Sequence, residues 1–166
     1  MKKILLVVLS VMLLSALFVG SASTATAKEP KLLEFDTMLG VPPTLTGNQA
    51  SAAFRGINGG GRAWKLTSAN GELKAGGHLE IEVEGLVLVD TNLNPSAFFG
   101  VTVSCITSAG ATANIPAGNF PATAGGNAQI ETDVALPQPC FAPIIFVTST
   151  QTSANPTGNW FAVTGN

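Results

Sequence analysis

The clearest pattern of apolar and polar positions runs from His78 to Glu84, where the two kinds of residue alternate without a break. Successive side chains of a β-strand point to opposite faces, so three apolar residues would be buried on one face. The opposite face would expose the carboxylates of Glu80, Glu82 and Glu84. After Gly85 the pattern becomes an unbroken apolar run over residues 86–89, which indicates burial on both faces. The sequence therefore predicts one long strand bent at Gly85, preceded by a tight turn at Gly76-Gly77.

Short apolar segments between turn-forming residues recur along the rest of the sequence, and the whole chain holds 18 glycines and 10 prolines. Such spacing leaves little room for a helix of ordinary length and favours an all-β fold. A hairpin turn is expected at Asn70-Gly71. Residues 108–126, poor in large apolar side chains, are expected to be the most mobile loop, with a short strand at about 112–115 as the one ordered element that the pattern allows. The other expected strands cover residues 32–38, 52–57, 63–69, 98–107, 128–136, 142–150 and 160–164. We predict a single helix-free domain over residues 28–166, folded as an antiparallel β-sandwich, with a small β-barrel as the alternative.

The first 27 residues have the pattern of an export signal. Lys2 and Lys3 precede an apolar core over residues 4–19. The sequence Ala25-Thr26-Ala27 matches the small-residue pattern at which signal peptides are cleaved. The alternative is an uncleaved membrane anchor, but the apolar core is shorter than the roughly 20 residues that a span needs. We expect a signal peptide over residues 1–27 and a protein that is secreted or held at the cell surface, with no stable membrane insertion after cleavage.

Two cysteines, Cys105 and Cys140, are the whole cysteine content of the chain. An even number of cysteines in an exported protein favours a disulfide, and two buried free thiols are the alternative. With a single histidine, these cysteines are too few for an ordinary zinc site.

The balance of charge excludes some partners. Beyond residue 27 the chain keeps six basic and ten acidic residues, which gives a net charge of −4. Nucleic acids and anionic membranes attract basic surfaces, so neither is an expected partner.

The stripe Glu80, Glu82 and Glu84 is the first candidate for chemistry. Its carboxylates would lie about 6.5–7 Å apart along one strand, which is compatible with the carboxylate pair of an inverting glycosidase. Calcium is a second reading, because carboxylates are its usual ligands. The third and favoured reading is a charged exterior that keeps the strand soluble. His78, the only histidine, lies on the same face and is expected to be a solvated residue at a strand end.

The two tryptophans, Trp64 and Trp160, are the second candidate. Large aromatic side chains usually belong to the core in a domain that has few of them. The alternative is an exposed binding surface, since aromatic rings stack on sugars.

Several short motifs lie along nearly the whole chain beyond the signal. They are Phe35-Asp36-Thr37-Met38, Arg55-Gly56 with Gly59-Gly60-Gly61, the hairpin over residues 71–88, Phe120-Pro121-Ala122-Thr123, Pro139-Cys140, the segment 142–148 and Trp160-Phe161-Ala162-Val163-Thr164-Gly165. Together these motifs resemble a family of small exported bacterial proteins of uncharacterised function. The resemblance implies no activity, ligand or catalytic residue.

The sequence thus favours a secreted, non-enzymatic domain that binds or structures an extracellular component, either a cell-wall polymer, a glycan or a protein. No cofactor is expected, apart from the calcium reading. A carboxylate-based hydrolase and a self-assembling surface or matrix subunit are the alternatives. A deep cleft holding clustered acids would favour the hydrolase, and exposed aromatic side chains would favour binding.

Overall fold

The computed structural model describes residues 28–47 and 53–164, so the expected signal peptide lies outside the described residues. The described part contains a single short 3-10 helix, η1 (Pro43–Leu45), and no helix long and apolar enough to cross a bilayer. Its strands are β1 (Lys31–Phe35), β2 (Met38–Gly40), β3 (Trp64–Lys65), β4 (Ser68–Lys74), β5 (His78–Glu84), β6 (Val87–Leu88), β7 (Phe98–Ile106), β8 (Thr112–Pro121), β9 (Ala128–Asp133), β10 (Phe141–Thr148) and β11 (Trp160–Thr164).

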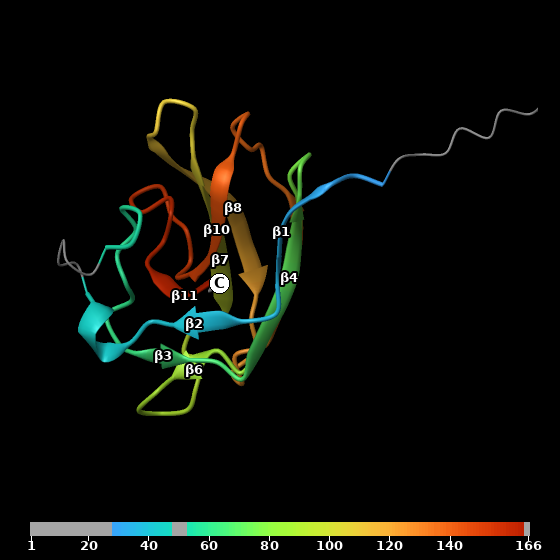
Figure 1. Cartoon of the computed structure of the whole chain (residues 1–166). Helices are drawn as coiled ribbons and strands as arrows, with labels where there is room; N and C mark the ends of the chain where they lie inside the picture. Colours follow the sequence, from blue (N-terminus) through green and yellow to red (C-terminus); the bar gives the residue numbers. More distant parts are fainter. Residues whose placement is uncertain (1–27, 48–52, 165–166) are drawn as a thin grey trace, which may run out of the picture.

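The strands form two main antiparallel sheets (Figure 1). One has the order β1-β4-β5-β9, and the other has the order β2-β11-β10-β7-β8. A short ribbon of β3 and β6 lies beside them. Neither main sheet closes on itself, and both contribute to one hydrophobic core. The prediction of an all-β sandwich is confirmed.

The core explains the alternating pattern of β5, whose apolar residues are all buried while its glutamates are exposed. Both tryptophans also belong to the core, because the side chain of Trp64 is only 5% exposed and that of Trp160 only 1%. The Trp64 ring stacks on Phe161 at a centroid distance of 3.9 Å. The alternative that the tryptophans line an exposed binding surface is therefore wrong, since packing leaves neither ring a free face.

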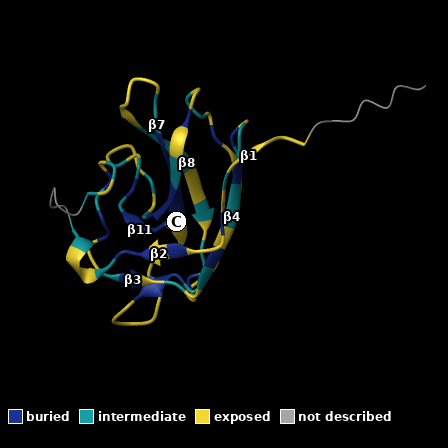
Figure 2. Ribbon diagram, in the orientation of Figure 1, coloured by how far each residue is buried: buried dark blue, intermediate teal, exposed yellow. Residues whose placement is uncertain are grey.

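The interior strands β7 and β11 of the five-stranded sheet are buried on both faces, whereas the edge strand β8 is not. Every residue of β7 from Phe99 to Cys105 is buried. Two loops cover the outer face of this sheet: Phe54 packs its ring edge-on against Phe146, and the Gln151 amide donates a hydrogen bond to the Val101 carbonyl. Figure 2 shows β11 coloured as buried, whereas β1, at the edge of the four-stranded sheet, is largely exposed. Consequently, the outer face of the four-stranded sheet is the one left open.

Cys105 and Cys140 form a disulfide, as predicted. It joins β7 to the residue before β10, and these two strands are hydrogen-bonded neighbours. The predicted turn at Gly76-Gly77 is also confirmed, because it joins β4 to β5 and Gly77 has a φ of 100°.

Several predicted boundaries are wrong, and two errors concern glycine. The expected turn at Asn70-Gly71 lies inside β4, where Gly71 pairs with both Phe35 and Ile81. A Cβ at Gly71 would overlap the Glu80 carbonyl, so glycine permits close packing here and forms no turn. The long strand predicted over residues 78–89 ends at Glu84, because Gly85 takes a φ of 65° and directs the chain into β6 of another sheet.

Pairing between distant strands accounts for two further differences, and a local turn accounts for a third. The predicted mobile loop over 108–126 contains the ten-residue strand β8, which pairs with β7 along its length. The predicted strands 32–38 and 63–69 are each divided between two sheets. Residues 53–57 of the predicted strand 52–57 form a turn closed by a bridge between Phe54 and Ile57, while Ala52 lies outside the described residues.

Candidate functional site

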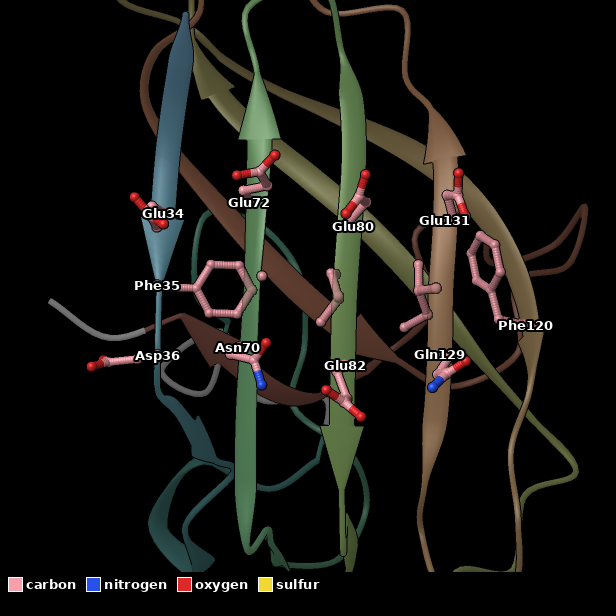
Figure 3. Close-up of a pocket in the computed structure, with 13 residues that line it drawn as sticks. Glu34, Phe35, Asp36, Asn70, Glu72, Glu80, Glu82, Phe120, Gln129 and Glu131 are labelled. Carbon is pink, nitrogen blue, oxygen red and sulfur yellow. The ribbon is translucent and has the colours of Figure 1, made fainter.

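The open outer face of the four-stranded sheet gathers most of the acidic side chains of the domain. Strand alternation directs the apolar residues of β4, β5 and β9 into the core and their polar residues outward. We call this surface the acidic face; its polar side chains are Glu34, Asp36, Asn70, Glu72, Glu80, Glu82, Gln129 and Glu131 (Figure 3).

Four glutamates form a row across the face, one on each strand. Glu34 lies opposite Glu72, Glu72 opposite Glu80, and Glu80 opposite Glu131. Figure 3 shows them side by side on β1, β4, β5 and β9. Neighbouring strands are about 4.8 Å apart, so the row spans roughly 14 Å. Like charges directly opposite each other destabilise a sheet, so this row requires compensation.

A second row lies one pleat further along the strands. Glu82 lies opposite Asn70 on one side and Gln129 on the other, and all three side chains are exposed. Phe120, from β8 of the other sheet, borders the face beside β9 (Figure 3). The face therefore offers carboxylate and amide groups on a rigid lattice, with one aromatic ring at its border.

Lysines neutralise the β1 and β4 side of the glutamate row. The Lys31 ammonium lies 2.6 Å from the Glu34 carboxylate and 2.7 Å from that of Glu72. The Lys74 ammonium lies 3.3 Å from Glu72. Hydrogen bonding to Lys31 holds the pKa of Glu72 below its usual value, with Lys74 adding to the effect, and bonding to Glu34 and Glu72 raises the pKa of Lys31.

The β5 and β9 side is less well compensated. Glu80 has Lys74 at 3.8 Å and the His78 ring at 2.7 Å. Within the described residues, no basic group lies within 4.0 Å of the carboxylates of Glu82 or Glu131. This half of the face therefore carries unbalanced negative charge.

His78 lies at the end of the face with a carboxylate on each ring nitrogen. Its Nε2 is 2.7 Å from Glu80 Oε1, and its Nδ1 is 3.1 Å from Asp133 Oδ1. Hydrogen bonding to Glu80, and secondly to Asp133, raises the pKa of His78 above its ordinary value. Ligand atoms of His78, Glu80 and Glu131 all lie within 4.8 Å of one another.

The glutamate stripe predicted from the sequence is divided in the structure. Glu80 and Glu82 belong to the acidic face, whereas the Glu84 carboxylate accepts a hydrogen bond of 2.8 Å from the Ser68 hydroxyl. The three residues lie on one strand but have different neighbours. Calcium binding by this stripe stays a prediction.

Sequence reasoning missed Glu34, Glu72 and Glu131 as members of the same site. They come from three different strands, and only the pairing of these strands brings the side chains together. A partial signal exists for Glu131, because the alternation over residues 128–134 places it on one face with Gln129 and Asp133.

Comparisons of the chain with models of protein families, with curated proteins and with solved structures found no match. The resemblance to a family of exported bacterial proteins therefore stays a prediction.

Proposed function

We propose that the chain is an exported, non-enzymatic binding domain whose acidic face holds a positively charged component of the cell exterior. The observation that carries the proposal is the in-register row of four glutamates on the open sheet face, neutralised on one side only. The Cys105–Cys140 disulfide supports export, because disulfides persist in oxidising compartments.

The unbalanced half of the face indicates the chemistry of the partner. Glu82 and Glu131 are exposed, so an ammonium or guanidinium group reaches them without displacing an internal ion pair. The neighbouring amides of Asn70 and Gln129 supply both donors and acceptors to polar groups beside the charge. A chain with repeated positive groups would bind several carboxylates at once, as multivalent attachment requires.

The openness of the face favours binding over hydrolysis. A glycosidase places its two carboxylates on either side of the scissile bond, and one of them acts as a general acid. Glu80, Glu82 and Glu131 are exposed on one side of a sheet, where they share a surface and do not enclose a substrate.

The test is retention of the purified protein on two cationic supports, a deacetylated amino-sugar polymer and a lysine-rich peptide. The acetylated form of the same polymer is the control for the charge. We expect retention on at least one cationic support, none on the acetylated polymer, and loss of retention as salt screens the charges. The support that retains the protein identifies the partner as polysaccharide or protein.

Two variants locate the surface. Glu82→Gln and Glu131→Gln should each weaken retention, whereas Asp90→Asn, which removes a carboxylate outside the acidic face, should not. Equal retention on the acetylated polymer, or equal loss in all three variants, would show that the acidic face is not the binding surface.

A further inference from the structure

Four ionisable side chains occupy a rectangular block on two paired strands at one end of the acidic face. His78 and Glu80 are two residues apart on β5, and Glu131 and Asp133 are two residues apart on β9. The register pairs His78 with Asp133 and Glu80 with Glu131. All four side chains therefore project from the same side of a rigid antiparallel pair.

The two ring nitrogens of His78 have different surroundings. Nδ1 faces the Asp133 carboxylate at 3.1 Å. Nε2 faces Glu80 at 2.7 Å, and Glu131 lies opposite Glu80. A carboxylate that holds one nitrogen of a histidine while the other nitrogen meets a metal is a common arrangement in metalloproteins.

We propose that His78, Glu80 and Glu131 bind one Zn²⁺ ion, with Asp133 orienting the imidazole through its Nδ1–H. Donors around a tetrahedral zinc at about 2.0–2.2 Å lie roughly 3.4 Å from one another. The three ligand atoms already lie within 4.8 Å of one another. Rotation of the exposed Glu80 and Glu131 side chains closes the difference while the strands stay in place.

The donor set selects zinc over calcium. Calcium takes six to eight oxygen ligands, whereas one imidazole nitrogen with two carboxylates suits zinc and leaves a position for water. A divalent cation also offsets the repulsion between Glu80 and Glu131, which the Lys74 ammonium, 3.8 Å from Glu80, reduces only in part.

The zinc site shares Glu131 with the proposed binding of a cationic partner, so the two proposals are separated by residues that only one of them uses. Glu82 belongs to the acidic face and is not a ligand, while His78 is a ligand and is not needed by a cationic polymer. The variants Glu82→Gln and His78→Gln therefore separate the two proposals, because each should affect one kind of binding and spare the other.

The experiment is a titration of the chelator-treated full protein with Zn²⁺. Binding is measured by calorimetry and by the NMR signals of the imidazole ring. His78 is the only histidine, so its ring signals need no assignment. We expect one Zn²⁺ per chain, a saturable shift of the ring signals, and no displacement by excess Ca²⁺. His78→Gln and Glu131→Gln should weaken binding about tenfold or more, and Asp133→Asn should weaken it less.

Glu82→Gln is the matched control, because it removes one carboxylate from the same strand and should leave the affinity for Zn²⁺ within about twofold. Thermal melting of each variant verifies that it is folded. Three results would overturn the proposal: no binding of Zn²⁺, binding that survives His78→Gln, or equal weakening in Glu82→Gln. The third result would indicate diffuse attraction of the cation to the negative surface.

Discussion

Loss of the Cys105–Cys140 disulfide should destabilise the domain by about 3–4 kcal/mol. The bond closes a loop between cysteines 35 positions apart, and the chain-entropy model gives about 3.8 kcal/mol for a loop of that length. The native strands β7 and β10 are hydrogen-bonded to each other, so reduction leaves their pairing in place. The main effect is therefore on the unfolded chain, which gains conformational freedom.

The assay is urea denaturation of the oxidised protein and of the double variant Cys105→Ala, Cys140→Ala, which carries no free thiol. Tryptophan fluorescence reports unfolding, because Trp64 and Trp160 are both buried in the folded state. We expect the free energy of unfolding to fall by about 3–4 kcal/mol and the melting temperature by roughly 10–15 °C.

Thiol alkylation without reduction is the control, and the oxidised protein should not react. A loss of stability below about 1 kcal/mol would refute the reasoning, because it would mean that the unfolded chain gains little freedom from breaking the bond.

Two further predictions concern the turn and the histidine. Gly77→Ala should destabilise the domain by roughly 2–4 kcal/mol in urea, because φ is 100° and a Cβ would overlap the Val134 carbonyl. Gly76→Ala, where the Cβ meets only a flexible glutamate side chain, should cost less than about 1 kcal/mol, and equal costs would contradict this account. In the presence of a chelator, His78 should titrate above its ordinary pKa of 6.5, and Glu80→Gln should lower its midpoint. Since the folded-state pKa is raised, the stability that His78 contributes is present below pH 6.5 and is lost as the pH rises through the folded pKa; a midpoint at or below 6.5 would contradict the pairing.

Local patterns in the sequence predicted the features whose causes are local. The alternation that gives β5 its two faces is contained within seven residues, and the turn is marked locally by Gly76-Gly77, since glycine tolerates positive φ. The disulfide could be predicted from the number of cysteines, because Cys105 and Cys140 are the only two and no other thiol competes for either.

Features that depend on distant neighbours were missed. Glycine serves as a turn at position 77, as a site of close packing at 71 and as a corner between sheets at 85, and only the neighbouring strands distinguish these roles. Strand β8 has few large apolar residues, and the pairing with β7 along its whole length is the contact that no local pattern reveals. The glutamate row likewise needs the strand order, which no short pattern contains.

The two sheets impose different limits on how far the sequence can change. Along β7, substitution at any position from Phe99 to Cys105 disturbs packing on one side or the other, so folding alone restricts all seven positions. Along β5, folding restricts every second residue and leaves the glutamates between them free. Under the proposed function, selection for folding and selection for binding act on separate positions of the same strand. A library randomised at the exposed positions of the acidic face should therefore preserve the core of the domain.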